Sequence, residues 1–412
     1  MVILHFYHYK GELMFSVKKS NTFHFLSIVS ILIGSLIGGI LTFVLSENGA
    51  ESSPYFMLVF AQVVLVFGPV LIFLLTQPGF WKNSLYLKNP GFVNLIMAVI
   101  LTLMLIPTVS LLNLLSMFFV QNQIADTVLS LTSYPYFSVI LVLAIFPGIF
   151  EELSTRFILL NNYRHKPYYI ACIMSGLFFG ILHLNVNQFI YAFVLGVVFA
   201  FMVQITESIY TSIAMHIALN TTTFSLSYLF SQQNSAELLD KLNDAVPAWT
   251  EVLSLLGVNI ITLPISILII LFLVNYNGKR AILRQKPTVL ELTLGHKFTE
   301  LDPNQPISWF YDTKGNPVGI SPASTPVPQS QAANWEQSVD WTGASDQSQT
   351  KLNSDLTDSA SFSKSPLNQP QPVLHQESVE IYLAKYHSPF NWAFWSSLIL
   401  FILLALLNEM AV

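Results

Sequence analysis

Residues 135–160, P-Y-F-S-V-I-L-V-L-A-I-F-P-G-I-F-E-E-L-S-T-R-F-I-L-L, form an apolar run that carries two glutamates and an arginine in its second half. A helix needs about 20 apolar residues to cross the ~30 Å hydrocarbon core of a bilayer, so this run is long enough to span it. A charge at that depth costs at least about 2.5 kcal/mol, so charged residues there need a structural or functional reason. The run therefore predicts a membrane helix that carries polar chemistry.

The composition of the whole chain agrees with this interpretation. Of 412 residues, 53% are hydrophobic and only 10% are charged, which is typical of a membrane protein. Inside lipid every backbone polar group must be paired within its own segment, so the spans are expected to be helices. We predict an all-α, polytopic bundle of about eight or nine spans, at roughly 24–46, 55–76, 91–120, 135–160, 168–184, 188–206, 208–231, 250–275 and 391–408. The third span is long enough to tilt or to break near Pro107.

The distribution of Lys and Arg predicts the orientation in the membrane, because short cytoplasmic loops are enriched in both. With the N-terminus inside, the outer loops contain a single basic residue, Lys241. The inner segments next to the spans contain eleven basic residues: Lys10, Lys18, Lys19, Lys82, Lys88, Arg164, Lys166, Lys279, Arg280, Arg284 and Lys286. We predict a multi-pass protein of the cell membrane with a cytoplasmic N-terminus and the lipid bilayer as its surroundings.

These signals divide the chain into six parts. They are a cytoplasmic tail (1–23), N-terminal membrane helices (24–134), a core that carries the polar motifs (135–231), an outer loop with one helix (232–275), a cytoplasmic insert (276–390) and a C-terminal membrane helix (391–412). The insert is rich in Ser, Gln, Pro, Asn and Asp, which predicts disorder, with local order around Ile307–Tyr311. The net charge of −5 comes from loops and tail, so nucleic acid is not expected as a partner.

The charged residues of the opening stretch are Glu151, Glu152 and Arg156. Glu152 and Arg156 are four residues apart, so they share a helix face, where the carboxylate can accept hydrogen bonds from the guanidinium. Glu151 lies about 100° further around the helix and lacks that partner. This leaves Glu151 as a candidate general base.

Two further motifs follow in the next apolar runs. F-G-I-L-H places Phe179 and His183 four apart, and H-I-A-L-N does the same for His216 and Asn220, so the members of each pair share a helix face. Polar side chains of these types on apolar helices point to a buried site.

The turns predict which of these groups meet. Pro167 is sixteen residues from both Glu151 and His183, so a hairpin there brings the two to about the same depth. His216 is only nine residues beyond the turn expected near Glu207, so its helix must be tilted or offset to reach that depth.

The motifs E-E-x3-R, F-x3-H and H-x3-N, in this order on successive hydrophobic helices, resemble those of the CPBP (CAAX protease and bacteriocin-processing) intramembrane proteases. That family includes type II CAAX prenyl endopeptidases and lysostaphin-resistance-like and bacteriocin-immunity proteins. The resemblance covers residues 135–231, about a quarter of the chain. It implies a membrane-embedded endopeptidase that hydrolyses a peptide bond in a membrane-associated protein or peptide.

The resemblance also implies roles for residues at matching positions. Glu151 and His183 would activate the attacking water, and His216 and Asn220 would stabilise the tetrahedral oxyanion. Glu152, Arg156 and Phe179 would support the site. Zinc held by Glu151, His183 and His216 is the alternative, because a glutamate and two histidines can bind it. The chain has no H-E-x-x-H motif and an asparagine is a poor zinc ligand, so hydrolysis without a metal or other cofactor is favoured.

Two other functions stay open from the sequence. A proton-coupled transporter would use Glu151, Glu152 and His183 as a relay and would predict repeated broken helices, which the sequence does not display. A non-catalytic immunity or scaffold protein would keep the same fold and present the insert to a partner.

Overall fold

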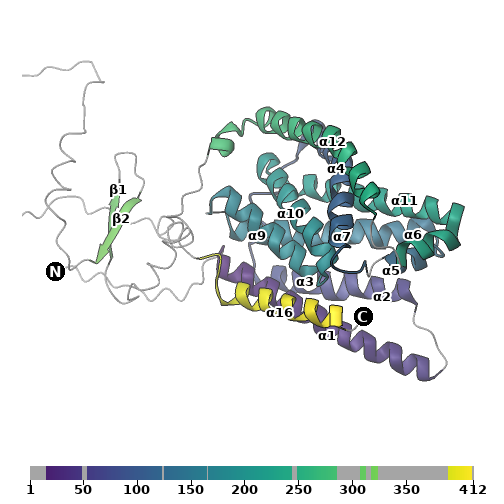
Figure 1. Ribbon diagram of the computed structural model, residues 1–412. Helices are drawn as coiled ribbons and strands as arrows, with labels where there is room; N and C mark the ends of the chain where they lie inside the picture. The colour runs from purple at the N-terminus through teal and green to yellow at the C-terminus, as the bar shows by residue number, and fades with distance from the viewer. Residues whose placement is uncertain are drawn as a thin grey trace, which may run out of the picture. The chain divides into compact units, whose positions relative to one another are not determined.

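The computed structural model of this chain describes residues 15–48, 53–122, 125–164, 166–243, 248–284, 307–311, 317–322 and 388–410. Within these ranges, each of the nine predicted spans coincides with a helical segment (Figure 1). The segments are α1 (Val17–Glu47), α2 to α3 (Pro54–Thr76), α4 (Gly91–Ser116), α6 to α8 (Tyr136–Asn162), α9 (Tyr168–Leu182), α10 (Val186–Thr206), α11 (Ile209–Asn243), α12 (Trp249–Tyr276) and α16 (Trp392–Met410). A short helix, α5 (Ala125–Leu131), follows α4, and a 3-10 turn, η4 (Arg280–Arg284), follows α12.

The polytopic helical bundle predicted from the sequence is confirmed. Among the described residues, six of these segments are long and apolar enough to cross a membrane, and two shorter apolar helices, α9 and Trp392–Leu407 of α16, accompany them. The remaining segment, α11, is 35 residues long and becomes polar in its second half. The chain is therefore a multi-pass membrane protein.

Two of the spans change helix type within their length. In α2 to α3 the middle turn is the π-helix η1 (Ala61–Val66), and in α6 to α8 two π-helices, η2 (Leu141–Ile145) and η3 (Leu153–Ile158), flank α7 (Phe146–Glu152). π-helical turns are rare and are frequently found at functional sites.

The third span, α4, does not break at Pro107 but passes through it as one helix. Asn259 of α12 donates from Nδ2 to the Pro107 carbonyl at 3.1 Å, and its Oδ1 accepts from the Thr108 hydroxyl at 2.7 Å. These two bonds join α4 to α12 at the proline and at the residue that follows it.

The two predicted turns are present. The chain leaves α8 (Leu159–Asn162) and starts α9 directly after Pro167, and α10 ends at Glu207, which has a left-handed backbone (φ 52°). At this second turn the Glu207 carbonyl accepts from the Lys88 amide at 3.3 Å, and the Ile209 amide donates to the Tyr86 carbonyl at 2.8 Å. The segment before α4 thus pairs with the turn between α10 and α11.

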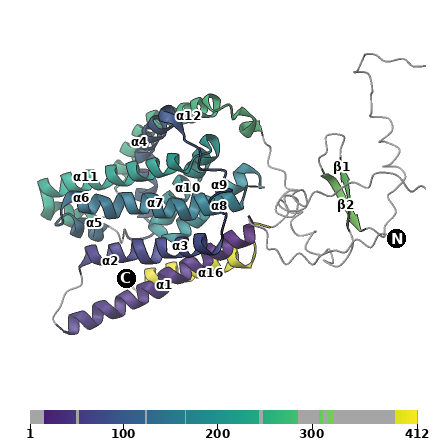
Figure 2. The same ribbon diagram turned by 180° about the vertical axis from the view of Figure 1, so that it is seen from behind.

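The C-terminal helix lies alongside the N-terminal one, as both views of the ribbon show (Figure 1, Figure 2). Asn21 of α1 donates from Nδ2 to the Pro389 carbonyl at 2.7 Å, and the Tyr163 hydroxyl donates to Asn21 Oδ1 at 2.7 Å. Phe394 of α16 packs edge-on against Phe178 of α9, with ring centroids 5.9 Å apart. The last span is therefore part of the bundle and contacts the helix that carries one of the site motifs.

The first helix begins earlier than predicted, inside the segment 1–23. His24, expected at a span edge, is fully buried, and its ring lies 4.5 Å from that of Phe178. Its Nδ1 pairs with the Ser20 carbonyl at 2.9 Å, so this histidine has a packing role.

Within the insert, the structure describes two strands, which belong to a compact unit separate from that of the helices. Strands β1 (Ile307–Tyr311) and β2 (Pro317–Pro322) pair antiparallel, with Trp309 opposite Ile320. The first strand coincides with the segment where local order was predicted. The disorder predicted for the rest of 276–390 concerns residues that lie mainly outside the described ranges.

Candidate active site

Five of the seven predicted site residues line one cavity of about 390 Å³: Glu151, Phe179, His183, His216 and Asn220. They come from α7, α9, the residue that follows α9, and α11. The two other predicted residues, Glu152 and Arg156, are fully buried behind the cavity. The three sequence motifs therefore converge in space.

The predicted pair between Glu152 and Arg156 is present and has a further partner. Arg156 Nη1 donates to Glu152 Oε1 at 3.0 Å, and His216 Nδ1 lies 2.9 Å from the same oxygen. A carboxylate only accepts, so the proton of this second bond is on His216 Nδ1. The bond fixes the imidazole ring and leaves its Nε2 as the nitrogen available to a ligand.

Both terminal nitrogens of the Arg156 guanidinium make hydrogen bonds. Nη1 donates to the Thr155 hydroxyl at 2.5 Å and Nη2 to the Gly196 carbonyl at 3.4 Å, while the guanidinium carbon lies 4.2 Å from the centroid of the Phe179 ring. Cations are attracted to the face of an aromatic ring. Phe179 therefore connects the buried arginine to the cavity wall.

Close approach of α9 and α10 depends on two glycines. A Cβ placed on Gly196 would lie 2.7 Å from the Gly176 Cα, and one on Gly176 would lie 2.7 Å from the Phe193 carbonyl oxygen. Neither contact is compatible with a side chain, so these glycines allow the two backbones to meet. This packing brings the Gly196 carbonyl within reach of Arg156.

His183 directly follows the last residue of α9 and so lies at a helix end rather than within the span predicted to reach residue 184. Its Nδ1 lies 2.7 Å from the Phe179 carbonyl oxygen, which can only accept, so Nδ1 carries the proton and Nε2 keeps its lone pair. The next residue, Leu184, has φ 52°. A bulky residue in this region costs on the order of 1–3 kcal/mol, and such strain is concentrated at functional sites.

Asn220 is oriented by a backbone carbonyl of the opposite helix. Its Nδ2 donates to the Leu143 carbonyl in η2 at 2.9 Å. Residue 147 is proline and has no N–H, so the α-helical bond from residue 147 to the Leu143 carbonyl is absent. An amide nitrogen has two N–H groups, so one remains for a ligand.

Glu151 differs from its neighbour Glu152. Among the described residues, no group donates a hydrogen bond to the Glu151 carboxylate and no cation pairs with it, although the side chain lines the cavity. A carboxylate in this position is free to bind water.

Several polar residues of the cavity wall were not identified from the sequence, among them Gln62 and Tyr191. Gln62, in η1, has its Oε1 buried with no hydrogen-bond partner in the described part of the chain, and Tyr191 lies on α10. Gln62 carried a detectable signal, because it is the single amide side chain in the apolar run 55–76. A buried acceptor without a partner is unfavourable unless a ligand or water satisfies it.

A second cavity of about 560 Å³ adjoins the first. The two share six wall residues: Val128, Leu143, Gln188, Tyr191, Leu219 and Asn220. The wall of the second cavity contains hydroxyl and amide side chains and no charged residue among those described. Asn220 thus lies where the two spaces meet.

The zinc alternative needs Glu151, His183 and His216 to act together as ligands. In the described ranges, no three His, Cys, Asp or Glu side chains are grouped as metal ligands. Glu151, His183 and His216 line one cavity without forming such a group.

The fold and the cavity define a polytopic membrane protein with a buried carboxylate, imidazole and amide site. Residues 133–222 match a family model described as type II CAAX prenyl endopeptidase, Rce1-like. The match confirms the resemblance predicted from the motifs and includes all seven predicted site residues. At the level of the family it supports a membrane endopeptidase of the CAAX-protease type. Comparisons with curated proteins and with solved structures gave no match.

Proposed function

We propose that the protein hydrolyses a peptide bond in a membrane-associated protein or peptide, with Glu151 as the general base. The observation that carries this proposal is the pairing state of the two adjacent glutamates. Glu152 is bound by Arg156 and His216, whereas Glu151 faces the cavity without a protein donor among the described residues. A base must be accessible to the water that it activates.

The proposed first step is water activation. Glu151 accepts a proton from a cavity water while the water oxygen forms a bond to the scissile carbonyl carbon. His183 Nε2, whose lone pair is free because Nδ1 is bound to Phe179, accepts a second hydrogen bond and orients the water. Protonated Glu151 then delivers its proton to the leaving amine as the C–N bond breaks.

The proposed oxyanion site consists of Asn220 and His216. The second N–H of Asn220 donates to the developing negative charge, while the first stays on the Leu143 carbonyl. His216 donates from Nε2 in its imidazolium form, while Nδ1 remains on Glu152. Arg156 and Glu152 are therefore positioning residues for His216.

Replacement of Glu151 tests the proposal. Glu151→Gln keeps the size of the side chain and removes the base, so turnover of an internally quenched peptide by purified enzyme should fall by about 10² or more. Its thermal unfolding midpoint should not fall. Glu47→Gln, at the exposed end of α1, is the matched control and should keep wild-type turnover. Wild-type turnover by Glu151→Gln would refute the role, and a wild-type enzyme that cleaves no peptide would favour the scaffold function.

We also propose that hydrolysis needs no metal. Asn220 supports this, because an amide N–H suits an oxyanion and not a cation. Activity should survive dialysis against a strong chelator, with metal content measured on the same sample. Loss of activity on chelation and its recovery with zinc would instead support the ligand set Glu151, His183 and His216.

A further inference from the structure

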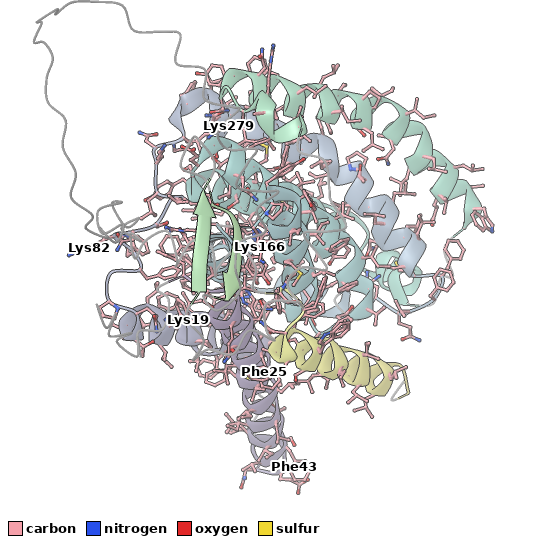
Figure 3. All side chains as sticks on the ribbon, turned by 90° about the vertical axis from the view of Figure 1, so that its left-hand side faces the viewer. Lys19, Phe25, Phe43, Lys82, Lys166 and Lys279 are labelled. Atoms are coloured by element: carbon pink, nitrogen blue, oxygen red, sulfur yellow. The ribbon has the colours of Figure 1, made fainter. Side chains whose placement is uncertain are left out.

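Among the described residues, all but one of the basic residues that the sequence places outside the spans lie at one end of the bundle. Figure 3 looks onto this end, where Lys19, Lys82, Lys166 and Lys279 are labelled, and Phe43 lies further along α1. These basic residues lie in the segments next to the start of α1, the start of α4, the start of α9 and the end of α12. They are Lys18, Lys19, Lys82, Lys88, Arg164, Lys166, Lys279, Arg280 and Arg284. Lys241, in the last turns of α11, belongs to the opposite end. The positive-inside rule assigns the basic end to the cytoplasm.

Neither cavity includes a residue from the segments of the basic end. Their wall residues at a helix terminus or in a loop, among them Asn122, Thr132, His183 and Gln188, all belong to the opposite end. The two cavities therefore extend from the middle of the bundle away from the basic loops.

A packed layer separates the site from the basic end. On that side of Arg156 the chain continues through Phe157, Ile158, Leu159 and Leu160, and each of these side chains has an exposed fraction of 0%. Tyr163, at the end of the layer, is equally buried. Seven residues of helix correspond to about 10 Å, which is too thick a layer for water or a peptide to cross without rearrangement.

We propose that the site opens to the extracytoplasmic side, so that its substrate is an exported or outward-facing peptide segment rather than the C-terminus of a cytoplasmic protein. The direction of access follows from the cavities, the packed layer and the basic loops. The identification of the molecule that enters the site as a peptide substrate rests on the proposed function.

The second cavity restricts the chemistry of the segment. Its hydroxyl and amide groups, among them Ser110, Thr223 and Ser227, can hydrogen-bond an extended peptide backbone. A charged side chain would find no counter-ion among the described wall residues and would lose its hydration. The ligand is therefore a peptide whose residues next to the cleaved bond are uncharged.

Accessibility of single cysteines tests the direction of opening without relying on activity. In a Cys172→Ala background, Thr132→Cys and Ser227→Cys in the second cavity are compared with Lys82→Cys at the basic end. A membrane-impermeant maleimide should label the first two only in right-side-out vesicles and the third only in inside-out vesicles. Labelling of the cavity cysteines from the basic side, or from both sides, would overturn the proposal.

Hydrolysis by wild-type protein in the same vesicles tests the ligand. An impermeant, internally quenched peptide with uncharged residues at the cleaved bond should be cut in right-side-out vesicles, and a lysine next to that bond should slow cleavage at least about tenfold. Cleavage confined to inside-out vesicles would contradict outward access. Expected labelling without cleavage of any peptide would retain the direction of opening and reject the peptidase function.

Discussion

Two asparagines make the same kind of bond in different surroundings. Asn220 donates to the Leu143 carbonyl beside Pro147, and Asn259 donates to the Pro107 carbonyl, in both cases between two helices. The difference is that Asn220 lines both cavities, whereas Asn259 lines neither. We therefore expect Asn220 to contribute to catalysis and Asn259 to contribute to helix packing alone.

Alanine substitution at these two positions should give different results. Asn220→Ala should lower kcat by about 10²–10³, the effect of removing one oxyanion donor. Asn259→Ala should keep kcat and lower the free energy of unfolding by about 1–3 kcal/mol, as expected for the loss of its two hydrogen bonds to α4. Peptide turnover and thermal unfolding of the purified variants measure both effects. Equal loss of kcat in the two variants would show that Asn220 acts through the fold.

At the scale of elements, the turn between α10 and α11 depends on one acidic residue. Glu207 accepts from Lys279 Nζ at 2.5 Å and from Lys88, which joins the turn to the end of α12 and to the segment before α4. These hydrogen bonds, with that from Lys279 the larger, lower the pKa of Glu207 below its ordinary value of 4.5. All three side chains are partly exposed, so the gain in stability is at most about 1 kcal/mol.

The lowered pKa fixes how stability depends on pH at this turn. The stabilisation is present above pH 4.5 and is lost as the pH falls through the lower pKa of the folded state, where Glu207 gains a proton. Glu207→Gln should therefore be less stable than wild type at pH 6 and nearly equal to it in strong acid. Thermal unfolding from pH 3 to 7 in detergent measures this difference. A constant difference across that range would exclude the ion pairs as its source.

At the scale of the whole molecule, the last helix completes the bundle that holds the site. Phe394 is 4% exposed and packs against Phe178 of α9, whereas its neighbour Trp395 is 51% exposed. Phe394→Ala should cost about 3 kcal/mol of unfolding free energy, in the range for a buried phenylalanine, and Trp395→Ala much less. Thermal unfolding of the two variants compares them directly. Equal effects would show that α16 is only a membrane tether.

The sequence by itself determined the features that depend on local rules. Span positions follow from the length of apolar runs, the turns at Pro167 and Glu207 from breaks in those runs, and the pair between Glu152 and Arg156 from helical periodicity. Each of these needs only residues close in the chain. The same information identified the three motifs and the family resemblance, and hence five of the residues that line the first cavity.

Only the tertiary structure decided contacts between residues far apart in the chain. It brings His216 to Glu152, 64 residues away, so that a glutamate predicted to pair with Arg156 also fixes an imidazole. It also places Asn220 within hydrogen-bonding distance of the Leu143 carbonyl. Gln62, which belongs to none of the three motifs, lies in the wall of the first cavity. Helical periodicity gives the face of a residue but not the helix that this face meets, because rotation and offset between helices are set by packing over the whole bundle.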